Sequence, residues 1–356
     1  MSILRPTRAA LVALLAATAA CSSESTSPRA IDTARLRADV QKAEAPFSTP
    51  VAQSLAALGG AMDNALGGSL VALPAEAIAS TGDDPLAASR RIANRAREVR
   101  VLNATADVIP ATLQGRTLEY DTATRRYVPG NRTGAPANGT RFVLYAVDPL
   151  TRRPVVPLAE TGYADLTRTI SNSAITARLE AFSGTTSPVK RIDYTASLSG
   201  TVTTPQVQIT GFASDGTDRL DFTLTTLVEL AAGRITVTNE AAIPTQQLAT
   251  RAQVIVDLVT EPGLRLDGRL ASEGGTVEMA GRIAADGNGT ITVRINGELF
   301  ATITVRPGQE PTVTNAAGQP VNAEEAAVII QIFKWFDEAD DLYDALSKPV
   351  EQALGF

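Results

Sequence analysis

Ser187 stands three residues before Lys190, the spacing at which a lysine amine can activate a serine hydroxyl for acyl transfer. That arrangement needs a helix start to bring both side chains to one face, whereas Pro188 leads here into the strand-like run VKRIDYTASL. Asp286 and Asn288 place oxygens at alternate positions, as a calcium loop does. A calcium site needs roughly six to eight oxygens, including a bidentate carboxylate, and no such acid follows at the right distance. Both stretches are therefore predicted to be turns.

The rest of the chemical inventory is limited, because the chain has no histidine and a single cysteine, Cys21, among 356 residues. The absence of histidine excludes Ser–His–Asp and Cys–His catalysis, histidine-bound zinc and the usual proton shuttle at neutral pH. We therefore do not expect an enzyme, and we expect no cofactor and no metal. No second cysteine is available for an intrachain disulfide.

The N-terminal residues have the pattern of an export leader. Arg5 and Arg8 precede the apolar run 9–20, which is too short to span a bilayer as a mature helix. Small residues then lead into Cys21. This segment resembles the bacterial lipoprotein signal, in which a short box of small residues precedes a cysteine; Thr18 stands where that signal usually has leucine. An ordinary secretory leader with a chance cysteine is the alternative.

The resemblance implies that residues 1–20 are removed and that Cys21 is acylated and anchors the protein to a membrane of the cell envelope. In a cell with two membranes, Ser22 after the cysteine is similar to signals for the outer membrane, on its periplasmic or surface side. Residues 21–48 are rich in serine, threonine, proline and charge, which predicts a flexible tether.

Charge and hydropathy restrict the remaining classes of partner. Loss of Arg5 and Arg8 would change the formal net charge from −6 to −8. An acidic chain is not expected to bind nucleic acid, which requires clustered cations. No later run reaches about 18 apolar residues, so we expect no transmembrane helix. With 44% hydrophobic residues, the chain can bury a sizeable core.

Two regions flank the centre of the chain with helical patterns. Residues 49–110 open with Thr49 as a plausible cap and Pro50 in the first turn, followed by apolar residues at helical spacing. Residues 322–356 begin with Asn322 as an N-cap and carry the strongest amphipathic pattern in the chain.

Residues 111–321 instead alternate between apolar and polar types. In LDFTLTTLVEL, for example, Leu220, Phe222 and Leu224 point one way and the intervening polar residues point the other. Turn signals rich in Gly, Asp and Asn recur throughout, which predicts hairpins between roughly 10 to 13 strands. No long helical pattern interrupts these strands, so we expect no parallel pairing.

The fold class predicted from these patterns is mainly β with flanking helices: a large, curved antiparallel meander or half-barrel with N- and C-terminal helices on its apolar face. In outline this is similar to the open half-barrel of lipid-carrying bacterial lipoproteins. The first hypothesis is therefore a lipoprotein that binds an apolar ligand, such as a lipid, between sheet and helix. Its candidate contact residues, which can equally be plain core, are Phe222, Leu224, Ile332, Phe333, Trp335 and Phe336. The alternative is a structural or protein-interaction lipoprotein of the envelope without a small-molecule ligand.

Overall fold

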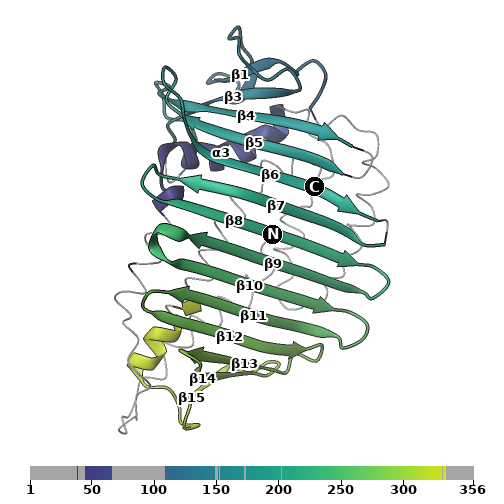
Figure 1. Ribbon diagram of the computed structural model, residues 1–356, viewed down its shortest axis with the longest axis vertical. Coiled ribbons are helices and arrows are strands. Elements are labelled where there is room, and N and C mark those ends of the chain that lie inside the picture. The colour runs from purple at the N-terminus through teal and green to yellow at the C-terminus, as the bar shows by residue number, and fades with distance from the viewer. Residues whose placement is uncertain are drawn as a thin grey trace. The chain divides into compact units, whose positions relative to one another are not determined.

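The computed structural model describes residues 38, 45–65, 109–148, 151, 153–171, 174–201, 203–330 and 332–333. Over these residues the protein is mainly β, with 15 strands in one open, largely antiparallel sheet and a short helix near each end (Figure 1). The prediction of a mainly antiparallel meander is confirmed. The predicted signal peptide, most of the predicted tether, Cys21 and all of residues 66–108 lie outside the described residues.

From β3 onward, neighbours in the chain are neighbours in the sheet. The strands are β1 (Arg116–Asp121), β2 (Arg126–Pro129), β3 (Gly139–Tyr145), β4 (Glu160–Ile170), β5 (Ile175–Ser183), β6 (Val189–Gly200), β7 (Pro205–Ser214), β8 (Arg219–Glu229), β9 (Arg234–Ile243), β10 (Leu248–Asp257), β11 (Gly263–Ser272), β12 (Gly275–Ala284), β13 (Gly289–Ile295), β14 (Glu298–Val305) and β15 (Thr312–Asn315). The described residues contain 15 strands, whereas the sequence predicts roughly 10 to 13, because strands as short as β2 and β15 do not show a clear alternation of apolar and polar residues.

One pairing differs from the prediction. β1 pairs with β2 in an antiparallel hairpin but with β3 in a parallel arrangement. The chain returns from the end of β2 through residues 130–138 before β3 begins, so β3 runs in the same direction as β1. The expectation of no parallel pairing was therefore wrong at this end, because a short irregular connection, without a helix, is enough to bring β3 parallel to β1.

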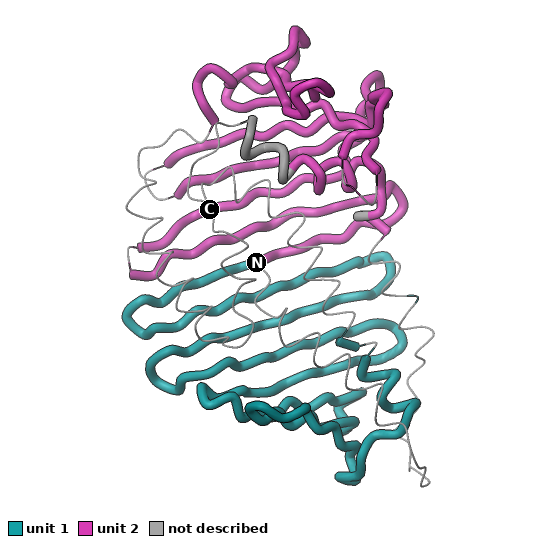
Figure 2. Tube along the Cα trace, turned by 180° about the vertical axis from the view of Figure 1, so that it is seen from behind, with its two compact units in different colours: residues 1–43, 74–94, 225–341 teal, residues 44–73, 95–224, 342–356 magenta. Residues whose placement is uncertain are grey.

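The chain divides into two compact units, shown in different colours in Figure 2. Unit 2 contains the helix α3 (Pro50–Ala65), strands β1 to β7 and β8 up to Leu224. Unit 1 contains the strands from Thr225 onward and the start of the C-terminal helix. Each unit is described by itself below.

The core of unit 2 lies on one face of the sheet. Leu166, Leu179 and Tyr194 lie directly opposite one another in β4, β5 and β6, and all three are buried. Helix α3 packs across β2 to β6 and contributes the buried residues Leu55 and Leu58. The alternation of side chains thus gives unit 2 an apolar face whose central row is buried.

The start of α3 is held by polar contacts. The Thr49 hydroxyl accepts a hydrogen bond from the Ala52 amide at 3.2 Å, as the predicted cap requires. The buried Ser54 hydroxyl lies 2.7 Å from the Tyr145 carbonyl oxygen at the end of β3. These contacts fix where α3 begins and which strand it meets.

In unit 1 the C-terminal helix is described at residues 323–330 and 332–333. The Asn322 side chain accepts hydrogen bonds from the amides of Glu324 and Glu325, each at 2.9 Å, and the Glu325 carboxylate accepts one from the Asn322 amide. This reciprocal arrangement is a capping box and confirms the predicted cap. Glu325 also contacts the Asn315 side chain, which joins the helix start to β15.

None of the helices within the described ranges has the length and apolar character that crossing a membrane requires.

Candidate functional site

The sequence-predicted contact residues fall into both units. Phe222 is buried in unit 2, where its ring centroid lies 6.2 Å from that of Tyr194, and Leu224 is half-buried. Ile332 is buried in unit 1 and Phe333 is half-buried. The other two predicted residues, Trp335 and Phe336, lie outside the described residues. Phe222 thus contributes to the core of unit 2, and the two described pairs belong to different units.

Unit 1 has an apolar face that is only partly covered. We use the name apolar face of unit 1 for the side of β8 to β13 that includes Val228, Ile235 and Val256. These three form a buried cluster, and half-buried aliphatic side chains surround it: Leu230, Val237, Val254, Leu258 and Leu264. The strand register places every Asp, Glu and Arg of β9 to β13 on the opposite face.

A row of half-buried side chains crosses this face. Val237, Val254 and Leu266 lie directly opposite one another in β9, β10 and β11, and each keeps part of its surface exposed. Asn239, on the same face of β9, has a buried Oδ1 atom with no hydrogen-bond partner among the described residues. An unsatisfied buried acceptor costs free energy, and a ligand with a donor group would satisfy it. Sequence reasoning missed Asn239, because its asparagine type alone does not reveal its burial.

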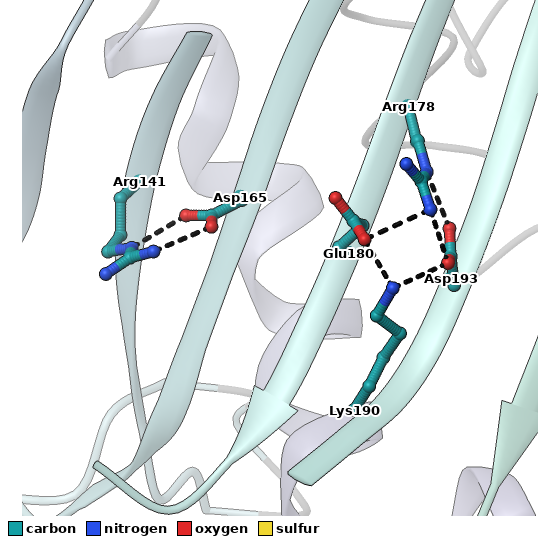
Figure 3. A network of polar contacts seen from close by, with 6 residues as sticks. All are labelled: Arg141, Asp165, Arg178, Glu180, Lys190 and Asp193. Carbon is teal, nitrogen blue, oxygen red and sulfur yellow. Dashed lines mark hydrogen bonds and ion pairs between the residues drawn. The ribbon is translucent and has the colours of Figure 1, made fainter. Parts of the chain in front are cut away.

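The opposite face of unit 2 carries charge, and we call it the charged face of unit 2 (Figure 3). Asp165, Glu180 and Asp193 lie opposite one another across β4, β5 and β6, so three carboxylates form a row. Arg141 binds Asp165 through two hydrogen bonds of 2.7 Å each. Like charges directly opposite each other destabilise a sheet, so the other two carboxylates also need cations.

Two cations from the same face bridge those carboxylates. Arg178 Nη2 lies 3.1 Å from Glu180 and 2.7 Å from Asp193, and the Lys190 ammonium contacts both carboxylates as well. Burial disfavours the charged form of Asp193, but the hydrogen bonds from Arg178 and Lys190 outweigh it and lower the Asp193 pKa. The hydrogen bond to Glu180 likewise raises the Lys190 pKa. The network is closed by the protein's own groups.

Aromatic rings extend this closed surface. Tyr163 and Phe182 stack with centroids 4.8 Å apart. The Arg141 guanidinium covers the Tyr163 ring at 3.9 Å from its centroid, and the Lys190 ammonium lies 5.7 Å from that of Phe182. The cations therefore satisfy both carboxylates and ring faces, which favours a structural role for the charged face of unit 2.

The structure also places the two short patterns that could have indicated chemistry. Ser187 lies in an exposed bend before β6, whereas Lys190 lies within β6 between two carboxylates. An ammonium held in that way is a poor general base. In the β12–β13 hairpin, the Asp286 carboxylate accepts hydrogen bonds from the Asn288 amide and side chain, as a tight turn requires.

Within the described ranges, no group of three or more acidic or cysteine side chains is arranged to hold a metal ion. No known family model, curated protein or solved structure matches this chain.

Proposed function

We propose that this protein is a cell-envelope lipoprotein, anchored through Cys21, that binds an apolar ligand such as an acyl chain on the apolar face of unit 1. The observation that carries the proposal is the combination of a charge-free face with half-buried aliphatic side chains, including Val237, Val254 and Leu266. Such a face gains free energy when it is covered by another apolar surface.

The gross gain in free energy from covering this face with an acyl chain follows from the number of methylene groups buried. Each methylene group buried contributes about 0.8 kcal/mol, so ten methylenes of an acyl chain would contribute roughly 8 kcal/mol before the entropic costs of association. The Asn239 Oδ1 atom would accept a hydrogen bond from a hydroxyl or protonated carboxyl group at the polar end of the ligand.

In this proposal the sheet curves as a half-barrel around the ligand, and Trp335 and Phe336 continue the apolar stripe of the C-terminal helix over it.

An alternative occupant of the same face is the apolar surface of another envelope protein. Its supporting observation is that the sheet's edge strands suit pairing poorly: β2 and β15 have four residues each, and β2 ends in Pro129. A protein partner would therefore have to use a face of the sheet.

Lipid binding is tested with the full chain carrying Cys21→Ser, by native mass spectrometry for retained lipid and by titration with a fluorescent fatty acid. We expect Leu266→Gln to weaken probe binding about tenfold, because it places an amide in the half-buried row. The matched control is Asp267→Gln, which puts the same side chain on the next residue, on the opposite face. We expect the control to bind the probe as the parent does, with thermal unfolding showing that both variants fold.

A chain that retains no lipid and binds no probe would overturn the carrier proposal. Equal probe binding by both variants would place the ligand elsewhere. If neither lipid nor probe binds and Leu266→Gln alone reduces crosslinking to an envelope protein, the protein-interaction alternative is supported.

The anchor is tested separately by fractionating cells that produce the wild-type chain or Cys21→Ser. We expect the wild-type protein in the membrane fraction and the variant in the soluble fraction. A variant that stays in the membrane fraction would contradict anchoring through Cys21.

A further inference from the structure

The face of unit 1 opposite its apolar face carries arginines in direct opposition, and we call it the arginine face. Arg251 in β10 lies opposite Arg269 in β11, and Arg265 in β11 lies opposite Arg282 in β12. Side chains in such positions start about 5 Å apart, and like charges placed there repel each other. The fold therefore places two opposed pairs of arginines on one face of unit 1.

The carboxylates that contact Arg251 and Arg269 do not lie between these two residues. Glu240 is 3.6 Å from Arg251, and Glu278 is 3.9 Å from Arg269, so each acid contacts one member of the pair from its outer side. These two contacts are also exposed, with the arginine side chains 59% and 60% accessible. Exposed ion pairs of this kind contribute little to stability.

The second opposed pair, Arg265 and Arg282, also lacks, within the described part of the chain, a carboxylate that contacts both of its members. Arg282 contacts Glu261 at 2.9 Å, in the turn before β11, and Arg265 forms no ion pair with any described residue. Asp267 lies between Arg265 and Arg269 along β11, on the same face. The arginine face also includes Arg294, which lies opposite Glu278 and donates a hydrogen bond to the Gly297 carbonyl.

The charged face of unit 2 shows how such repulsion is relieved. There Glu180 and Asp193 are opposed in the same way, and both Arg178 and Lys190 bridge the two carboxylates. For the opposed arginines no described carboxylate forms an equivalent bridge. An anion from outside the chain, placed between the two guanidinium groups, would do for them what the two cations do for the carboxylates.

We propose that the arginine face binds the phosphate groups of an anionic phospholipid membrane surface. Guanidinium groups donate paired hydrogen bonds to phosphate oxygens, which suits them to this ligand. The five arginines are spread over β10 to β13, about 15 Å at the usual strand spacing, so they match an extended surface better than one small anion. The inference does not depend on the proposed apolar ligand; the proposed anchor would only raise the local concentration.

The test is cosedimentation of the full chain carrying Cys21→Ser with vesicles of phosphatidylglycerol and phosphatidylcholine, against vesicles of phosphatidylcholine alone. We expect binding to the anionic vesicles and little to the neutral ones. The double variant Arg251→Gln/Arg269→Gln should lose about fivefold in affinity per arginine removed. Raising the salt to about 1 M should abolish binding, because it shortens the screening length to about 3 Å.

The matched control is Arg125→Gln/Arg126→Gln, at the end of the β1–β2 turn and the exposed start of β2 in unit 2, which removes the same charge from another part of the chain. We expect it to keep parental binding, and thermal unfolding shows that both doubles fold. An equal loss of vesicle affinity in both double variants would overturn the proposal, because binding would then depend on overall charge and not on the arginine face. Equal binding to neutral vesicles would also overturn it. Displacement from the anionic vesicles by millimolar inorganic phosphate, at matched ionic strength, would assign the face to a free anion instead.

Discussion

Units 1 and 2 are built from strands of the same kind, yet the two apolar rows described above differ in burial. Leu166, Leu179 and Tyr194 cross unit 2 as a buried row, whereas Val237, Val254 and Leu266 cross unit 1 as a half-buried row. A buried row stabilises the fold, and a half-buried row is available to a ligand.

The charged face of unit 2 and the arginine face of unit 1 also differ, in whether their opposed like charges are bridged by counter-charges of the chain. In unit 2, opposed carboxylates are bridged by cations of the chain at short distances (Figure 3). In unit 1, Arg251 and Arg269 are opposed, and their contacts to acids are longer and lie outside the pair. If the two proposals above hold, unit 2 is the scaffold and unit 1 carries the binding surfaces on both of its faces.

The largest expected effect separates the two apolar rows. Leu179→Ala should lower the free energy of unfolding by about 2 to 5 kcal/mol, because it leaves a cavity beside a side chain that is only 1% exposed. Leu266→Ala should cost about 1 kcal/mol, since the leucine is already half-exposed. Urea denaturation followed by circular dichroism measures both. Equal losses would contradict the assignment of the rows to scaffold and ligand face.

The next effect concerns the closed network. Asp193→Asn should destabilise the protein by about 1 to 2 kcal/mol, because it weakens charged hydrogen bonds to Arg178 and Lys190 at a site 15% exposed. The charged hydrogen bond to Arg178 contributes less than it would in a buried site, because Arg178 is partly exposed and solvent screens the interaction. The matched variant Asp267→Asn, on an exposed position of β11, should change stability by less than about 0.5 kcal/mol. If both variants lose the same stability in urea denaturation, the ion pairs of Asp193 contribute no more to stability than the exposed Asp267 does.

A smaller effect follows from pH. The Asp193 pKa is lower in the folded protein, so its contribution is fully present above the unfolded value of about 3.9 and is lost as pH falls through the folded value. The difference in stability between the wild type and Asp193→Asn should therefore be constant from pH 7 to 5 and shrink below about pH 4. Urea midpoints at a series of pH values measure it. A difference that persists unchanged at about pH 2 would mean that the ion pairs do not cause it.

The smallest expected effect has the opposite sign. Arg269→Thr removes one member of an opposed pair and introduces a residue that favours strands, so it should stabilise the protein by a few tenths of a kcal/mol at low salt. The gain should fade as salt is added. Arg178→Thr in unit 2 provides the comparison and should destabilise the protein. A loss of stability in Arg269→Thr would show that Arg269 already has an adequate partner within the chain.

Much of the fold could be predicted because strands and caps depend on local patterns. The alternation in LDFTLTTLVEL and the turn around Asp286 predicted strands and hairpins that the structure contains. Asn322 was identified as a cap because its type and the acids after it are sufficient to form the capping box.

The candidate sites were less predictable. Phe222 and Leu224 belong to one alternating run, yet one is buried and the other half-buried, since burial depends on what packs over each position. The parallel pairing of β1 with β3 was missed because it depends on the path of an irregular loop.

The strand content, the turns, the helix caps and the separation of apolar from charged side chains follow from each residue and its near neighbours, so they can be read from the amino-acid order. The register depends on the folded sheet, because it places residues far apart in sequence directly opposite each other. That register bridges Glu180 and Asp193 with cations, leaves Arg251 facing Arg269, and exposes part of Leu266. Interactions between strands depend on cross-strand partners, and alternation along one strand does not specify them.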